Sequence, residues 1–236
     1  PMRTDIVGFS IAAAPGEASY VPTGHQARLG DDGQLPLPDV LAKLAPLIED
    51  PEIAITGHNL KFDIVALANN GVTVRGVAFD TMLAAFLLGE GGGAGRPEEG
   101  SLSLKWLVAR RLGRDIQEPA DLAPKARGKA EQLSMQQLDA DSLGPAACTC
   151  VDMTARLCDI FEPELGAKGM RHLFDEIEMP LVSVLARIEL NGVAVDTGTL
   201  REMADSLTID IRRIEEDIYA SVGHEFNIGS PKQLSD

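Results

Sequence analysis

The pattern of apolar and polar positions predicts an α/β architecture for the first part of the chain. Apolar runs at residues 6–13 and 17–21 flank a Pro-Gly turn and predict a β-hairpin. Helical spacing follows at residues 37–48, where Pro46 should kink the helix or end it early. A strand at residues 53–55, a helix at 59–69, a strand at 77–79 and a helix at 81–88 continue an alternation typical of α/β layers.

Beyond residue 88 the pattern becomes helical. Residues 89–100 are rich in glycine but lack the Gly-Lys-Ser/Thr of a phosphate loop, which favours a linker. An amphipathic helix follows Ser101, and further helices run from about Met135 to Ile160 with an interruption at Gly144-Pro145. A long helix from Arg171 carries an apolar stripe: Leu173, Ile177, Leu181, Leu185 and Ile188. A charged helix from Thr199 then suggests a second, incomplete helical unit, which begins near Pro180.

Composition narrows the functional classes. The 236 residues carry a formal net charge of -15, which argues against a protein that coats DNA but not against a nuclease that holds cations. No apolar run approaches the roughly 18 residues that span a bilayer, and no signal peptide is visible. The three cysteines (Cys148, Cys150 and Cys158) suit free thiols. We therefore expect a cytoplasmic protein without a membrane partner.

The motif Gly57-His58-Asn59-Leu60-Lys61-Phe62-Asp63 is the first candidate site. Asn59 and Asp63 are four residues apart where a strand becomes a helix, so both project from one face of the first turn. An amide and a carboxylate at the carboxyl end of a strand suit a metal ion and a phosphate-bearing substrate. The simpler alternative is an Asn N-cap with a solvated Asp behind it, and the spacing alone leaves both open.

Four segments taken together resemble the bacterial family A DNA polymerases (the DNA polymerase I family). They are GHNLKFD, VRGVAFDTMLAAFLL, IEMPLVSVLARIELNGVAVD and EFNIGSPKQL, in the family's order and spacing. The resemblance implies that residues 1–176 form a 3′-5′ exonuclease (proofreading) domain. Its fold would be ribonuclease-H-like, an α/β mixed sheet flanked by helices that lacks its first strand. Residues 177–236 would be the junction and the beginning of the polymerase thumb, so we expect a fragment.

The resemblance also implies a chemistry, two-metal hydrolysis of a phosphodiester with Mg²⁺ or Mn²⁺ held by four carboxylates. The family's first motif, Asp-x-Glu, aligns before Pro1, and the second supplies Asp63. The third, Tyr-x-x-x-Asp, falls on Ala146 and Cys150, which provide neither a hydroxyl nor a hard oxygen ligand. Asp152 lies two positions further on, about 200° around a helix. We expect this chain to lack exonuclease activity and to act as a scaffold for the polymerase.

Several residues are implied as DNA contacts. The partners would be a single-stranded 3′ end and a primer-template duplex, met through the full-length polymerase by a monomeric, nucleoid-associated protein. The basic loop with Lys125, Arg127 and Lys129 could contact single-stranded DNA or could equally be a solvated loop without a DNA contact. The implied DNA-binding residues are Phe62 beside the second motif, Lys125, Arg127 and Lys129 in the basic loop, and Asn227, Ser230 and Lys232 in the thumb segment.

Other candidates have structural interpretations. Asp80 follows a strand, and the Asp-Thr sequence predicts a helix cap rather than a catalytic group. His58 is expected to be structural, and Trp106 to belong to the core.

Two functional alternatives remain open. The parent protein could be an active proofreading exonuclease, which Ala146 and Cys150 argue against. The chain could also be a freestanding ribonuclease-D-like nuclease or nucleic-acid-binding module, which the junction and thumb motifs argue against. Loss of a central strand would leave the isolated chain marginally stable.

Overall fold

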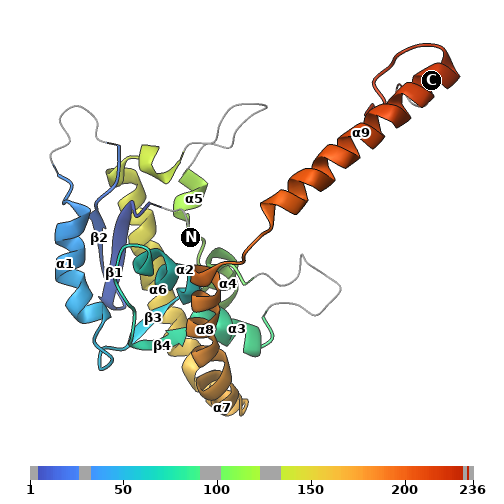
Figure 1. The fold of residues 1–236 in the computed structure, drawn as a ribbon. Coiled ribbons are helices and arrows are strands. Elements are labelled where there is room, and N and C mark those ends of the chain that lie inside the picture. Colours follow the sequence, from blue (N-terminus) through green and yellow to red (C-terminus); the bar gives the residue numbers. More distant parts are fainter. Residues whose placement is uncertain (1–4, 27–32, 91–101, 123–133, 231–232, 234–236) are drawn as a thin grey trace. The chain divides into compact units, whose positions relative to one another are not determined.

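The structure is a computed structural model that describes residues 5–26, 33–90, 102–122, 134–230 and 233. The chain divides into two compact units, Pro1–Asn191 and Gly192–Asp236. The elements of each unit can be followed in Figure 1. The predicted domain boundary at residue 177 stays a prediction.

Four strands form two separate two-stranded sheets within the described residues. β1 (Gly8–Ala14) and β2 (Glu17–Pro22) make the predicted antiparallel hairpin. β3 (Ile55–Gly57) and β4 (Val77–Asp80) pair in parallel, with Gly57 opposite Asp80. Both strand directions are therefore present, as expected for the α/β class, and the parallel pair places the ends of two strands side by side.

Helices cover the strands in the order that the pattern predicts. α1 (Leu37–Ile48) follows the hairpin, and α2 (Leu60–Ala68) and α3 (Thr81–Leu87) follow β3 and β4. α4 (Leu104–Leu112) and α5 (Pro119–Leu122) come next, then a 3₁₀ turn at Met135–Gln137. The prediction that Pro46 ends α1 early is wrong, because the helix continues for two residues beyond it. Pro46 removes only the one hydrogen bond that its missing N–H would donate.

The predicted break at Gly144-Pro145 is also wrong. α6 (Ala140–Ala167) is one helix of 28 residues that contains Pro145 and Pro163. It packs against both strands of the hairpin, and Gly144 lies so close to Tyr20 that an added Cβ would come within 3.1 Å of the ring. This close packing offsets the hydrogen bond that Pro145 cannot donate.

Two apolar clusters make the core of the first unit. The larger contains the fully buried Leu157, Phe161 and Leu165 of α6 with Phe174. The smaller joins Leu60, Ile64 and Val65 of α2 to Val182 and Ala186. Those last two residues belong to α8 (Met179–Asn191), which follows α7 (Arg171–Leu173) and a π-helical segment, Phe174–Glu178.

The second unit is dominated by α9 (Thr197–Val222), 26 residues long. Asp196 caps it by accepting hydrogen bonds from the backbone N–H groups of Gly198 (2.9 Å) and Thr199 (3.0 Å). Gly223, with φ of 82°, ends it near the predicted position. Among the described residues, no helix is long and apolar enough to cross a membrane.

Candidate active site

The candidate site is organised around Asp80 at the end of β4. This side chain is 1% exposed, and its carboxylate accepts hydrogen bonds from four backbone N–H groups. Two belong to Asn59 (3.1 Å) and Leu60 (2.7 Å) at the start of α2, and two to Met82 (2.8 Å) and Leu83 (3.4 Å) in α3. The predicted cap is confirmed for α3, and the same carboxylate also serves the first turn of α2.

Asn59 precedes α2 but does not cap it with its side chain. Its backbone lies in the left-handed region (φ 64°, ψ 50°), and no side-chain cap hydrogen bond is present. It is the single described residue other than glycine with positive φ. The Asn N-cap alternative is therefore wrong in its chemistry, because Asp80 supplies the acceptor and Asn59 supplies the turn. Its amide side chain is not used as the helix cap.

Asp63 lies in the first turn of α2, where its side chain reaches solvent although the surrounding region is dense with protein atoms. Desolvation, the larger cause, and the nearby Asp80 carboxylate together raise the pKa of Asp63 to about 7. A carboxyl group with such a pKa is partly protonated at neutral pH. Asp63 is thus a weaker anionic ligand than an ordinary solvated aspartate.

His58 holds the turn between β3 and α2 from the other side. Thr81 Oγ1 donates its single hydrogen to the Gly57 carbonyl (3.2 Å). In its 2.9 Å contact with His58 Nδ1 the hydroxyl oxygen must therefore accept, which makes Nδ1 the donor. Burial lowers the pKa of His58 and outweighs the opposing effects of Asp80, the Leu102 backbone and Glu118. A neutral imidazole with these contacts agrees with the predicted structural role.

The third-motif positions lie on one face of α6. Ala146 is buried, and Cys150 is half-buried and packs against the larger apolar cluster. Burial raises the pKa of the Cys150 thiol to about 11, with further contributions from Glu118 and Asp121. The thiol therefore stays protonated at neutral pH, whereas a metal ligand must be the thiolate.

Asp152 does not replace the missing aspartate. Its carboxylate accepts a hydrogen bond of 2.6 Å from the backbone N–H of Gly16 in the hairpin turn, and it forms an ion pair with Arg156. These contacts hold α6 against the hairpin. The predicted orientation away from the third-motif face is in keeping with them.

Glu118 is a site residue that the sequence did not reveal. Its carboxylate accepts a hydrogen bond of 3.0 Å from the backbone N–H of Lys105, and its charge acts on both His58 and Cys150. No motif spacing connects these residues in sequence, so only the tertiary structure could identify it. Its position shows that the segment before α5 lies close to the third-motif face of α6.

The residues present do not fit a pair of catalytic cations. In the described part of the chain, no group of three or more His, Cys, Asp or Glu side chains could hold a metal ion. Asp80 is committed to backbone N–H groups, and Cys150 is a protonated thiol. Of the family's carboxylate positions that fall within the described residues, Asp63 remains accessible. Mg²⁺ usually binds proteins through one or two carboxylates together with substrate phosphates.

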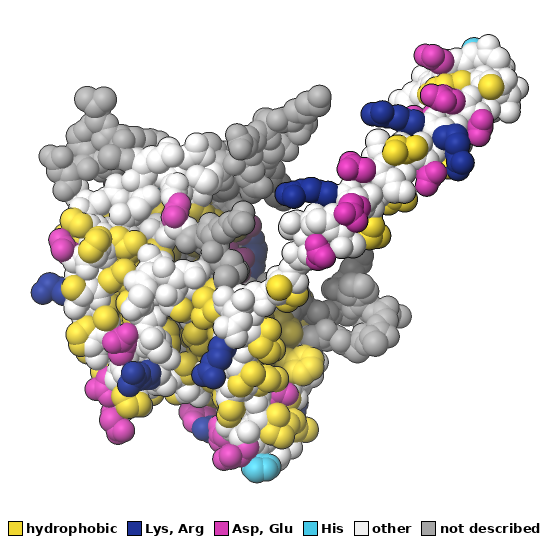
Figure 2. Space-filling model, viewed as in Figure 1, with side chains coloured by type: hydrophobic (Ala, Val, Ile, Leu, Met, Phe, Trp, Pro, Cys, Tyr) yellow, Lys and Arg dark blue, Asp and Glu magenta, His cyan; other side chains and the backbone are white. Residues whose placement is uncertain are grey.

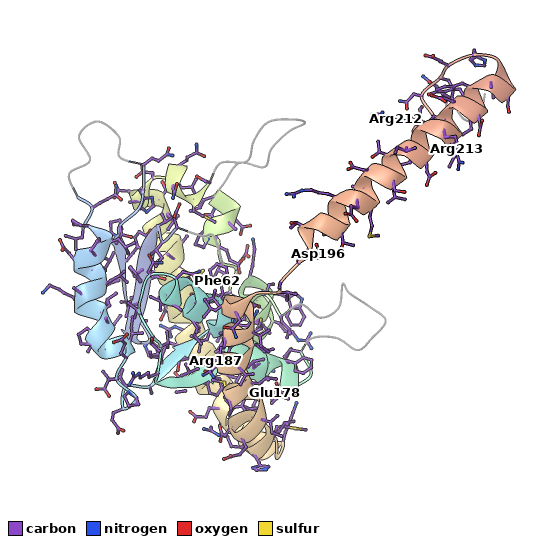
Figure 3. All side chains as sticks on the ribbon, in the orientation of Figure 1. Phe62, Glu178, Arg187, Asp196, Arg212 and Arg213 are labelled. Atoms are coloured by element: carbon purple, nitrogen blue, oxygen red, sulfur yellow. The ribbon has the colours of Figure 1, made fainter. Side chains whose placement is uncertain are left out.

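The predicted DNA contacts are only partly described. Phe62 is 43% exposed on α2, beside Asp63 in sequence (Figure 3). The Asn227 carboxamide accepts a hydrogen bond from the Gly229 backbone N–H (3.0 Å), and Ser230 Oγ accepts one from Gln233 (3.4 Å), so both side chains stabilise a local turn. The remaining predicted contacts lie outside the described residues: Lys125, Arg127, Lys129 and Lys232.

Comparison with known proteins identifies the family to which the chain belongs. A sequence model of the 3′-5′ exonuclease family matches residues 1–166, so the chain belongs to this family. The matching proteins are named DNA polymerase I, which confirms the resemblance to the bacterial family A DNA polymerases. The ribonuclease-H-like exonuclease fold expected from that resemblance is confirmed with it.

The relatives are much longer than this chain. DNA polymerase I of Pseudomonas aeruginosa is 39% identical over 235 residues, which are 98% of this chain and 24% of that protein. DNA polymerase I of Chloroflexus aurantiacus is 35% identical over 238 residues, again 24% of its length. The POL domain of Pol1 from M. smegmatis, solved with a DNA primer-template and dNTP, is 28% identical with a TM-score of 0.67. It is matched over 98% of this chain and 33% of its own.

Proposed function

We propose that this chain is a proofreading-type domain of a DNA polymerase I that does not hydrolyse DNA and serves the polymerase as a structural unit. The observation that carries the proposal is Cys150 at the third-motif aspartate position. A half-buried thiol whose pKa is raised to about 11 offers Mg²⁺ no oxygen ligand and no negative charge. Ala146 at the tyrosine position has no hydroxyl to orient a water molecule.

The two-metal reaction of the family needs cations that stabilise both the attacking and the leaving oxygen. Asp63 is the one family carboxylate among those we placed on this chain, and its pKa of about 7 lets protons compete with cations. With Cys150 at the third-motif aspartate position, the family's set of carboxylate ligands is incomplete within this chain. The chemistry of the ligand set therefore supports a role without catalysis.

We also propose that such a protein binds DNA mainly through its polymerase part. The M. smegmatis Pol1 structure contains a DNA primer-template, which makes DNA the natural partner for this family member. This chain carries a formal net charge of -15, so it repels the phosphate backbone at long range. On its own we expect it to bind DNA weakly and with a strong dependence on salt.

The test is a nuclease assay on the purified chain. A 5′-labelled single-stranded oligonucleotide is incubated with Mg²⁺ or Mn²⁺ and with wild-type protein or the Asp63→Ala variant. We expect both proteins to leave the substrate intact while a 3′-5′ exonuclease of established activity degrades it. Degradation by the wild-type chain that Asp63→Ala abolishes would overturn the proposal.

A further inference from the structure

The end of α3 turns a glutamate back into the protein. The backbone N–H of Gly89 (φ 87°) donates a hydrogen bond to the Phe86 carbonyl, and that of Glu90 donates one to the Ala85 carbonyl, both at 3.0 Å. These two hydrogen bonds form a Schellman motif, in which the second residue after the helix cap usually makes an apolar contact. Glu90 occupies that position here and is 8% exposed. A carboxylate in such a place needs ionic or hydrogen-bonding partners.

Two arginines in the last turn of α4 supply these partners. Arg110 Nε donates to Glu90 Oε2 at 2.9 Å, and Arg111 donates to the other carboxylate oxygen. Arg111 also donates through its second terminal nitrogen to Glu164 of α6, and its guanidinium carbon lies 5.2 Å from the centroid of the Phe161 ring. Two carboxylates and two guanidinium groups balance in charge. We call Glu90, Arg110, Arg111 and Glu164 the clasp.

The clasp is more sheltered than an ordinary surface ion pair. Figure 2 shows charged side chains of both signs scattered over the surface of the first unit, where ion pairs contribute little to stability. In the clasp, the side chain of Glu90 is 7% exposed and that of Arg111 is 20% exposed, whereas Glu164 (37%) and Arg110 (60%) are the outer members. Removing one inner partner therefore leaves a charge in poorly hydrated surroundings.

The clasp joins parts of the chain on either side of residues 91–101, which lie outside the described residues. Glu90 precedes this segment, and the other three members follow it. Lys168 makes a further bond across the same interval, from its Nζ to the Leu88 carbonyl at 2.9 Å. Side chains as well as the peptide chain therefore hold the end of α3 in place.

The larger apolar cluster also spans this interval. It contains Ala85 and Leu88 at the end of α3 together with Leu104 and Leu107 of α4. Apolar burial is non-directional, whereas a guanidinium–carboxylate pair has a fixed geometry. The cluster therefore supplies most of the attraction between the two parts of the chain, and the clasp fixes how α4 lies against the end of α3.

We propose that the clasp makes the first unit independent of peptide continuity at residues 91–101, so that the unit keeps its structure when the chain is cut or extended there. Tolerance of a cut depends on what holds the flanking backbone. Here the clasp, the Lys168 bond and the apolar cluster do so. The consequence is a position at which proteolysis or an inserted segment leaves the fold intact.

The experiment places the recognition sequence of a site-specific protease between residues 95 and 96 of the full chain. Wild type, Arg111→Met and Arg171→Met are purified intact, verified as folded by circular dichroism, and then cut. Arg171 is the matched control, because it also bonds two carboxylates, Glu162 (2.8 Å) and Asp175 (2.6 Å), but all three residues follow the cut. Gel filtration at micromolar concentration should show the cut wild type as one species that elutes with the intact chain.

A dilution series of each cut protein then gives the dissociation constant of its two pieces. We expect Arg111→Met to raise this constant roughly tenfold or more, because Glu90 loses its better-buried arginine and Glu164 loses the same partner. Arg171→Met should leave the constant unchanged.

Separation or unfolding of the cut wild type at micromolar concentration would overturn the proposal. Equal dissociation constants for cut Arg111→Met and cut Arg171→Met would also overturn it, because the apolar cluster alone would then hold the pieces. If Arg111→Met is unfolded before cutting, Glu164→Gln takes its place, since it removes only an outer carboxylate of the clasp. For that variant we expect an increase of about threefold in the dissociation constant, and no increase would refute the clasp.

Discussion

Asp80 Oδ2 accepts a hydrogen bond of 2.7 Å from the backbone N–H of Leu60, twenty residues earlier in the chain. The backbone N–H groups in the first turn of a helix have no acceptor within the helix. This one buried carboxylate accepts hydrogen bonds from such groups at the starts of both α2 and α3. The second exonuclease motif therefore owes its shape to a residue that the motif does not contain.

Replacing Asp80 should be among the most damaging single changes in the site. Asp80→Ala leaves four buried or partly buried N–H groups without their acceptor, and we expect a loss of about 3 kcal/mol or more in the free energy of unfolding. Asp80→Asn keeps one acceptor oxygen and should lose less. Asp139→Ala, which removes the cap of α6, is the control, with an expected loss of about 1 kcal/mol. Urea denaturation measures all three, and equal losses for Asp80→Ala and Asp139→Ala would contradict the double role.

Asn59 should tolerate glycine better than alanine. Its left-handed backbone costs nothing for glycine, while alanine is strained there by about 1 kcal/mol. Because its side chain is not the helix cap, Asn59→Gly should leave Tm nearly unchanged and Asn59→Ala should lower it. Gly71→Ala, at φ of 81°, provides a comparison for the cost of the same backbone region. A large loss for Asn59→Gly would show that the carboxamide itself stabilises the turn.

The stability contribution of Asp63 should depend on pH with a defined sign. Its folded-state pKa of about 7 lies above the ordinary value of 3.8, so ionisation is disfavoured in the folded protein. The penalty is absent below pH 3.8, grows as the pH rises, and is complete above about pH 7. Asp63→Asn should therefore be more stable than wild type at pH 8, by about 1 kcal/mol after allowance for solvent screening of an exposed side chain.

The same variant should match wild type near pH 4. Guanidinium denaturation of both proteins at several pH values measures the difference. A difference that is constant with pH, or that favours wild type at pH 8, would be incompatible with a raised pKa of Asp63. Asp39→Asn, an acidic residue in the first turn of α1, provides the matched control on another helix start.

Placing a carboxylate at the third-motif position should lower the stability of the fold in the absence of bound cations. Cys150→Asp places a charge beside Glu118 and Asp121, and we expect a loss of about 2 kcal/mol at neutral pH. If the new carboxylate and its neighbours form a cation site, Mg²⁺ or Mn²⁺ will raise the Tm of Cys150→Asp selectively. The uncharged Cys150→Asn variant is the control. A Tm rise in both variants would indicate general cation binding instead.

The sequence predicted local structure well where local chemistry decides it. The Pro15-Gly16 turn, the Asp80 cap and the start of α2 were all visible as short patterns. The sequence pattern predicted wrongly that Pro46 and Pro145 would interrupt their helices. The lost backbone hydrogen bond is visible in the local sequence, whereas the packing that offsets it comes from the tertiary structure. For Pro145 that compensation is the close packing of Gly144 against Tyr20, more than 100 residues away in sequence.

The candidate site could be predicted only in part. The motif identifies Asp63, but its pKa depends on desolvation and on Asp80, which reaches it through the pairing of β3 with β4. Glu118 has no sequence relation to His58 or Cys150. Likewise, helical periodicity predicted an apolar stripe from Leu173 to Ile188, but periodicity cannot tell a buried face from an exposed one, and most of this stripe is exposed.

The ion pair between Lys61 and Glu189 joins α2 to α8 within the first unit. Lys61 lies two residues before Asp63, and Glu189 lies two residues before the end of α8. Val182 and Ala186 pack on the same side, so α2 and α8 share one apolar cluster. The first turn of α2, where the family keeps its second metal-binding motif, is therefore tied to a residue 128 positions later in the chain.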